Sequence, residues 1–295
     1  MSEPKQIKEL LQVGQRVLED STHVFEDHDN EDAVRQLLAA ALRVTDDELD
    51  ELGAGHEPVR RDRERYLALV ARRAAGEPLP FLTGRIDFYG LDLQVKPGAF
   101  VPRPSSELTV ERAVKRLKRR SDPIAVDVCT GAGPIALAIA DAVPMSHVWG
   151  TDIAAEAIRH GRSNARRLGI GNVRLVAGDL YDALPKRIKG RVDVVTAHVP
   201  YVPSDELEDL PSEVKEFEPL YTLTDHSFDG LGLMRAVAVE AVEWLAPGGW
   251  LLLEMSEDMT GKVKKICARV GFEEIGVADD EFDLSVVVEA RKPRR

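Results

Sequence analysis

The strongest indication of the fold is the stretch IAVDVCTGAGPIALAIA, residues 124–140, in which an apolar run leads through a turn into an apolar helix. Gly131 and Gly133 allow the backbone to turn sharply and to approach a ligand closely, and N–H groups at the start of the helix point toward that ligand. Pro134 suits the first helical position, where its missing N–H would have no partner in any case. This strand, turn and helix predict the first unit of an α/β sheet with a ligand site at the turn.

The rest of the chain beyond this stretch alternates short apolar strands with helical segments. Between helices such as residues 154–168 and 231–245, we predict strands over residues 124–129, 147–151, 173–177, 192–197 and 250–255. This alternation indicates βαβ units and a mostly parallel, Rossmann-like sheet that is covered on both faces. The last two segments, residues 272–278 and 283–290, predict an antiparallel pair at the edge of the sheet.

The chain before residue 98 has a different pattern. Residues 33–44 and 59–75 carry apolar side chains at helical spacing. Residues 84–95 alternate polar and apolar side chains around Tyr89 and Gly90, which predicts a β-hairpin. We therefore expect three parts: a helical domain over residues 1–82, a linking hairpin over residues 83–97 and a catalytic domain over residues 98–295.

Composition and charge exclude several classes of protein. The 295 residues are 44% hydrophobic and 31% charged, as in ordinary globular proteins. The formal net charge of -12 disfavours general binding to nucleic acids or anionic membranes, whose phosphates such a chain repels. The two cysteines lack CxxC spacing, the histidines lack HExxH spacing, and no apolar run reaches the roughly 18 residues of a membrane span. The charged N-terminus does not resemble a secretory signal. We expect a cytoplasmic protein without a bound metal.

Acidic residues follow three of the predicted strands, at Asp127, Asp152 and Asp179. The turn satisfies the dinucleotide pattern GxGxxG/A, and Asp152 lies about 20 residues further on, as in NAD-dependent oxidoreductases. The alternative ligand is S-adenosylmethionine (SAM), whose ribose also binds a carboxylate but whose methionine portion replaces the pyrophosphate. Acids at all three strand ends favour SAM, because its ammonium and sulfonium are cationic. A third interpretation needs no ligand: the glycines form a tight turn, and two of the acids cap helices.

Several stretches together resemble the HemK/PrmC family of class I SAM-dependent methyltransferases, the protein-(glutamine-N5) methyltransferases that modify peptide-chain release factors. They are GEPLPFLTGRIDFYGLDLQV, FVPRPSSEL, DVCTGAGPIALAIA, GTDIAAEAIRHGRSNARRLGIGNVRLVAGD, VDVVTAHVPYVP and LAPGGWLLLEM. The likeness extends from about Arg72 to the C-terminus, and the helical N-terminus resembles the family's small substrate-recognition domain. The resemblance implies a class I methyltransferase fold and SAM as the cofactor, with S-adenosylhomocysteine as its product.

The resemblance also implies roles for individual residues. Substrate binding falls to Arg103, in the loop Pro102-Arg103-Pro104, and to Glu218. Cofactor binding falls to residues at the strand ends: Asp127, Thr130, Gly131, Gly133, Asp152, Ile153, Asp179, Leu180 and His198.

The expected catalytic segment is His198-Val199-Pro200-Tyr201, where the family has Asn-Pro-Pro-Tyr. In the family pattern, the Asn side-chain oxygen and the next backbone carbonyl accept both hydrogens of a planar NH2 group, and the tyrosine packs against that group. Val199 retains the carbonyl and Tyr201 retains the ring. The imidazole of His198 offers one acceptor nitrogen when neutral and can take up a proton.

We therefore expect a SAM-dependent N-methyltransferase that acts on a glutamine nitrogen of a release-factor-like protein. An alternative substrate is a free amino acid such as arginine, because its guanidinium must lose a proton that His198 can accept and the acidic residues 204–218 would attract it. An NAD-dependent oxidoreductase and a non-catalytic SAM-binding protein are further alternatives. The sequence makes no prediction about the oligomeric state.

Overall fold

The structure of the chain is a computed structural model that describes residues 4–23, 29–279 and 285–295. The chain divides into two compact units. One unit comprises Met1–Ile86, Val95–Pro97 and Asp209–Phe217, and the other comprises Asp87–Gln94, Gly98–Glu208 and Glu218–Arg295. The segment Asp209–Phe217 thus joins the N-terminal helices, whereas the sequence placed it in the catalytic domain.

The first unit consists of helices around a core of its own. Leu10, Leu37 and Tyr66 are fully buried in this core. The carboxylate of Asp29 caps the second helix by accepting backbone N–H groups, which satisfies donors that the helix itself leaves unpaired. The two helices predicted in this region are confirmed as α2 and α4. The helices of the unit are α1 (Ile7–Glu19), α2 (Asn30–Leu42), α3 (Asp46–Leu52), α4 (Arg60–Ala74), α5 (Leu79–Thr83) and α9 (Ser212–Phe217).

The predicted hairpin is confirmed as β1 (Arg85–Phe88) and β2 (Leu91–Gln94), which form a two-stranded sheet. Its two-residue turn holds Tyr89 at φ 53° and Gly90 at φ 75°. Positive φ at both central positions is typical of the tight turns whose twist matches that of a hairpin.

The second unit contains a seven-stranded sheet in the order β5-β4-β3-β6-β7-β9-β8. The first five of these strands pair in parallel, and β9 pairs antiparallel with both β7 and β8. The predicted antiparallel edge pair is therefore confirmed, although residues 283 and 284 lie outside the described residues. The strands are β3 (Ile124–Val128), β4 (His147–Asp152), β5 (Val173–Ala177), β6 (Val192–Ala197), β7 (Leu245–Ser256), β8 (Glu273–Asp279) and β9 (Ser285–Arg291).

Strand β7 begins earlier than the sequence predicts, at Leu245 instead of Trp250. The register of β6 against β7 shifts here, because Val192 pairs with Leu245 while Val194 pairs with Trp250. Gly248 lies inside this irregularity at φ 78°, a conformation that suits glycine. The Pro-Gly-Gly step therefore forms a bulge inside β7, although its sequence is typical of a loop.

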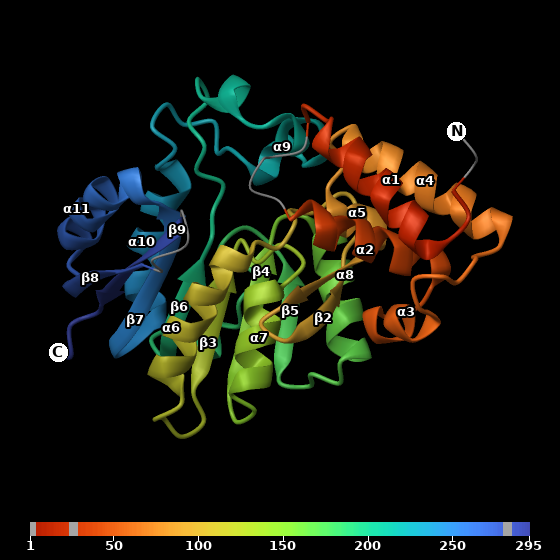
Figure 1. The fold of residues 1–295 in the computed structure, drawn as a ribbon. Helices are drawn as coiled ribbons and strands as arrows, with labels where there is room; N and C mark the ends of the chain where they lie inside the picture. Colours follow the sequence, from red (N-terminus) through yellow and green to blue (C-terminus); the bar gives the residue numbers. More distant parts are fainter. Residues whose placement is uncertain (1–3, 24–28, 280–284) are drawn as a thin grey trace. The chain divides into compact units, whose positions relative to one another are not determined.

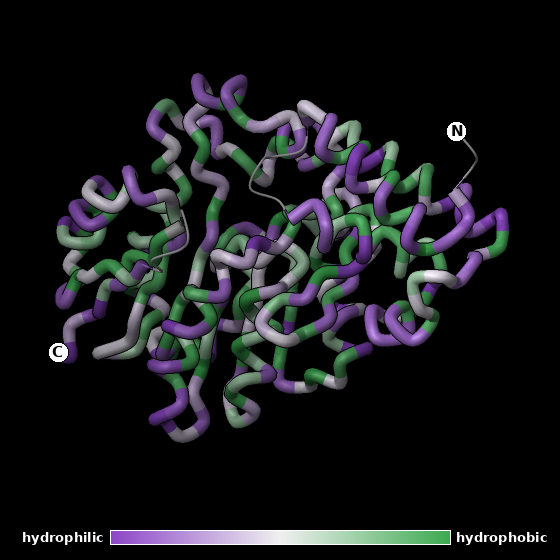
Figure 2. Tube along the Cα trace, in the orientation of Figure 1, coloured by the Kyte–Doolittle hydropathy of each residue, from purple (hydrophilic) through white to green (hydrophobic). Residues whose placement is uncertain are grey.

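Helices cover both faces of the sheet, and Figure 1 shows their arrangement. On one face, Val195, Leu251 and Val288 pack in a core with Met234 and with residues of the last two helices. Burying such an aliphatic side chain completely contributes roughly 1.5–3 kcal/mol to the stability of the fold. In Figure 2 the strands are largely green, the colour of hydrophobic residues. The face that carries Val195 and Leu251 is covered by α10 (Gly232–Trp244) and α11 (Thr260–Val270). The opposite face is covered by α6 (Glu107–Leu117), α7 (Pro134–Ala142) and α8 (Ala155–Arg167).

Short 3-10 helices connect several of these elements: η1 (Pro104–Ser106), η2 (Lys186–Ile188), η3 (Leu207–Asp209), η4 (Leu220–Thr222) and η5 (Glu257–Met259). Among the described helices, none is long and apolar enough to cross a membrane.

The strand order defines where a ligand site is expected. The chain leaves β3 outward through β4 and β5 and then returns to β6 on the other side of β3. At such a reversal the connections diverge and leave a crevice beyond the carboxyl ends of the strands, where ligands of open α/β sheets bind. Asp127 of β3 and His198, which directly follows β6, lie at this reversal. The predicted class I Rossmann-like fold is confirmed.

Candidate active site

The turn after β3 leaves room for a ligand beside its backbone. Gly131 and Gly133 have φ values of 57° and 81°, which other residues adopt only with strain. A Cβ atom added to Gly131 would meet no other atom within 4 Å, whereas one added to Gly133 would lie 3.0 Å from Leu175. Gly131 therefore faces open space, and Gly133 lies against the packed interior.

Asp152 at the end of β4 is held by backbone donors. The N–H of Gly131 donates to one carboxylate oxygen at 2.8 Å, and the N–H of Ala154 donates to the other at 2.8 Å. Burial raises the pKa of Asp152, and the two backbone donors oppose this shift. Ile153 beside it leaves 65% of its surface exposed. A fixed carboxylate with a free lone pair on each oxygen, next to apolar surface, can hold a diol and a flat ring.

Asp127 on β3 is buried, with 1% of its surface exposed. The hydroxyls of Thr130 and Thr196 donate to its two oxygens at 2.5 and 2.7 Å. Burial raises the pKa of Asp127 to about 7, the hydroxyl donors oppose the shift, and the charges of Glu254 and Asp152 add to it. A cation placed beside this carboxyl would stabilise its ionised form.

The third acid follows β5. Asp179 is exposed, and the neighbouring Leu180 has a positive φ of 39° and a buried side chain. The carbonyl of Leu180 accepts a hydrogen bond from the Thr151 hydroxyl at 2.5 Å. The structure therefore places the three predicted acids at or just beyond the carboxyl ends of adjacent strands.

His198 belongs to a group of polar side chains that we call the His198 cluster: His198, Glu254, Ser106 and Thr109. Glu254 on β7 is fully buried, and it accepts hydrogen bonds from Ser106 at 2.7 Å and from Thr109 at 2.9 Å. The Nδ1 atom of His198 lies 3.3 Å from Glu254 Oε1 and 3.4 Å from Ser106 Oγ. The sheet brings His198 and Glu254 together, because Ala197 at the end of β6 pairs with Leu253 on β7, and these two residues come next along the chain.

Two aromatic rings enclose the imidazole. Phe100 meets His198 edge to face at a centroid distance of 5.5 Å, and Tyr201 stacks on it at 5.7 Å with 24° between the planes. Only 15% of the His198 side chain is exposed. Burial and the charge of Glu254 raise the pKa of Tyr201 to about 12, with Arg103 opposing the shift, so its phenol is neutral. Val199 is buried, and Pro200 is half-buried.

Arg103 and Glu218, which the sequence predicts to bind the substrate, form an ion pair with each other. Glu218 also accepts the backbone N–H of Val101 at 3.4 Å, and its side chain is fully buried. The Arg103 guanidinium lies 4.6 Å from the ring centroid of Phe100, which in turn contacts His198. The pair thus supports one wall of the His198 cluster, and its role toward the substrate stays a prediction.

Sequence reasoning missed Glu254, Ser106, Thr109, Thr196 and Phe100. A usable signal for Glu254 was a charged residue within the otherwise apolar run WLLLEM, since a buried carboxylate needs polar partners. Ser106 and Thr109 are three residues apart at the start of α6 and therefore share one face. Their partner on β7 is set by the tertiary structure alone.

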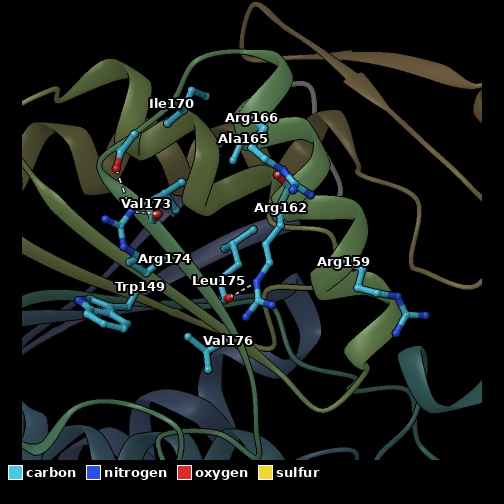
Figure 3. A pocket seen from close by; sticks show the side chains of 11 residues that line it. Trp149, Arg159, Arg162, Ala165, Arg166, Ile170, Val173, Arg174, Leu175 and Val176 are labelled. Carbon is cyan, nitrogen blue, oxygen red and sulfur yellow. Dashed lines mark hydrogen bonds between the residues drawn. The ribbon is translucent and has the colours of Figure 1, made fainter.

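A separate groove of about 730 Å³ lies between α8 and β5, and none of the predicted site residues lines it. Arginine side chains surround its apolar floor, as Figure 3 shows. Arg162 donates to the Leu175 carbonyl at 2.8 Å, and Arg174 donates to the Val173 carbonyl at 3.0 Å. These arginines therefore cover backbone groups of the edge strand, which protects the sheet from pairing with another chain.

Comparisons with known proteins agree with this geometry. A family described as "Methyltransferase domain" matches residues 125–217. A release factor glutamine methyltransferase from Burkholderia pseudomallei is 36% identical over 233 residues, which cover 77% of this chain and 79% of the relative. A 4-amino-L-phenylalanine/4-methylamino-L-phenylalanine methyltransferase from Streptomyces pristinaespiralis is 38% identical, covering 75% of this chain and 73% of the relative. A solved methyltransferase structure from Pyrococcus furiosus has the same fold, with a TM-score of 0.50 and 19% identity over 69% of this chain and 90% of its own.

Proposed function

Because the chain belongs to the release factor glutamine methyltransferase (HemK/PrmC) family, we propose that it methylates the side-chain nitrogen of a glutamine in a release-factor-like protein, with SAM as the methyl donor. That it is a SAM-dependent N-methyltransferase follows from its relatives and its methyltransferase domain. The comparisons do not favour the NAD-dependent oxidoreductase or the free-arginine methyltransferase. The observation that supports the proposed chemistry is an imidazole that follows β6 directly, is paired with a buried carboxylate and lies at the reversal of the strand order.

The residues at the strand ends fit SAM. Gly131 leaves open space at the turn, where a side chain would interfere with a ligand. Asp152 has free lone pairs for a ribose diol, and the exposed Ile153 offers an apolar surface for a planar base. Asp127 lies where a methionine ammonium would stabilise its ionised form. Thr130 and Gly133 shape this turn, and Asp179 and Leu180 supply a polar group and backbone at the third strand end. When bound, SAM supplies an electrophilic methyl group on a sulfonium.

The chain's own contribution to the reaction is to position a weak nucleophile. An amide nitrogen reacts poorly because its lone pair is delocalised into the carbonyl. We assign the Val199 carbonyl and the Nε2 atom of His198 as acceptors of its two hydrogens, and the Pro200-Tyr201 step as the wall beside its plane. Acceptors in these positions stabilise positive charge that develops on nitrogen, and alignment alone contributes several kcal/mol. The proton leaves after transfer, so that no strong base is needed.

The experiment that tests this function uses SAM with a labelled methyl group. We expect label in a release factor, and tandem mass spectrometry should locate it on one glutamine nitrogen. Free arginine and 4-amino-L-phenylalanine serve as comparison substrates. Label in either small molecule, with none in the factor, would overturn the proposed substrate.

A further inference from the structure

Glu254 has no place in the scheme above, yet it is a fully buried carboxylate in the strand next to His198. We propose that Glu254, held by Ser106 and Thr109, is a positioning residue that keeps the hydrogen of neutral His198 on Nδ1. In the neutral ring the opposite nitrogen, Nε2, is then the acceptor for a hydrogen on the substrate nitrogen. This inference rests on the proposed function for its substrate, but its structural part is testable without any substrate.

For a neutral imidazole, the hydrogen-bonding groups around Nδ1 select one of the two tautomers. A serine hydroxyl has a single hydrogen, and Ser106 donates it to Glu254 at 2.7 Å. Toward Nδ1, Ser106 therefore presents only a lone pair, and the Glu254 carboxylate does the same. Nδ1 lies 3.4 Å from the first acceptor and 3.3 Å from the second, so it is stabilised only when it carries a hydrogen. Neutral imidazole has one N–H, which leaves Nε2 as the acceptor.

The surroundings of Glu254 hold it in this orientation. Its second oxygen accepts the Thr109 hydroxyl at 2.9 Å, so that both oxygens are fixed by donors from the start of α6. Within the described part of the chain, His198 is the only basic side chain paired with Glu254. Burying a carboxylate is unfavourable unless hydrogen-bonding partners compensate for the lost water, so packing alone does not account for a glutamate here.

The imidazole itself is also restrained. The edge contact with Phe100 and the stacked ring of Tyr201 limit the rotation of the His198 ring. A flipped ring would place a carbon atom against Glu254 and Ser106 and would remove the N–H group that faces them. The restraint therefore selects both the ring orientation and the tautomer.

Nitrogen-15 NMR of the full chain with labelled histidine tests the tautomer directly. The sequence has 7 histidines, and loss of a signal in His198→Asn assigns the relevant one. We expect a protonated Nδ1 and an unprotonated Nε2 in the native protein. In Glu254→Gln the new amide can donate to Nδ1, so the hydrogen should move partly to Nε2. A hydrogen on Nε2 in the native protein, or an unchanged tautomer in the variant, would overturn the proposal.

Glu289→Gln is the matched control. Glu289 is another buried carboxylate of the same sheet, on β9, but it pairs with Arg112 and Arg116 and not with a histidine. Its replacement should leave the His198 signals unchanged. If Glu254→Gln does not fold, Glu254→Met replaces the carboxylate with an apolar side chain of similar length. The Ser106 hydroxyl, which then no longer donates to Glu254, can donate to Nδ1, so the hydrogen should again move toward Nε2.

Kinetics then separate positioning from general damage. Glu254→Gln should lower kcat at least about tenfold, as expected when a histidine loses the carboxylate that sets its tautomer, without changing affinity for S-adenosylhomocysteine. In a His198→Asn background the same change should alter kcat less than about twofold, because an amide oxygen is an acceptor in either case. Equal losses in both backgrounds would show a merely structural role. If the tautomer is as expected but no glutamine is methylated, the proposed substrate fails and the positioning role stands.

Discussion

At the scale of the residue, the site depends on buried carboxyl groups whose surroundings differ. Asp152 is fixed by two backbone donors, Asp127 by two threonine hydroxyls, and Glu254 by a serine, a threonine and a histidine. Of these, only Glu254 is coupled to a group that we place against the substrate. The other two lie at the ends of strands β3 and β4, where we place the cofactor.

The raised pKa of Asp127 predicts how cofactor binding depends on pH. Below about pH 7 the carboxyl is largely protonated and neutral, and above it the carboxylate can pair with the ammonium of the ligand. Affinity for S-adenosylhomocysteine should therefore rise as the pH increases toward 7 and level off above it, with a proton released on binding. Calorimetric titration at several pH values measures both effects.

The same group has the opposite effect on the stability of the free protein. Because the folded state holds a proton on Asp127 from the ordinary value of 3.8 up to about 7, the free energy of unfolding should fall as the pH rises through this window. Asp127→Asn should remove this contribution and flatten the pH dependence of the affinity. A variant that retains the native pH dependence would exclude Asp127 as its source.

At the scale of the element, the close approach of α8 to the turn after β3 fixes the geometry of the site. A Cβ atom added to Gly161 on α8 would lie 2.5 Å from the backbone oxygen of Ala132. Only a glycine at position 161 therefore permits α8 to approach the turn this closely. The same turn holds Asp152, because the N–H of Gly131 donates to its carboxylate. A displacement of α8 should therefore also displace the turn and Asp152.

Gly161→Ala should displace α8 from the turn and destabilise the second unit by about 1–3 kcal/mol, the usual effect of overpacking. Affinity for S-adenosylhomocysteine should fall with it, because the turn and Asp152 move. Thermal unfolding and calorimetric titration measure the two effects. Gly171→Ala is the control, since a Cβ atom there would meet nothing within 4 Å and the backbone needs no positive φ. Equal behaviour of the two variants would contradict this interpretation.

At the scale of the whole molecule, local patterns in the sequence predicted the elements but not all of their neighbours. Short apolar runs between helical segments predicted the position of every parallel strand, because parallel strands buried on both faces are continuously apolar. The strand order, the bulge before Trp250 and the inclusion of Asp209–Phe217 in the first unit depend on tertiary packing, which no local pattern reports. For the same reason, HVPY was recognisable as a departure from its family, whereas the partners of His198 on η1, α6 and β7 were not.

In the proposed reaction His198 accepts a hydrogen of the substrate nitrogen, in the place where the family has an asparagine. The most direct measurement compares kcat for methylation of the release factor by the native protein, His198→Asn and His198→Ala, with affinity for S-adenosylhomocysteine as the control. We expect kcat of the asparagine variant to stay within about tenfold of the native value and kcat of the alanine variant to fall about 100-fold or more, with affinity for S-adenosylhomocysteine unchanged in both. Equal activity of the alanine variant and the native protein would contradict this role of His198.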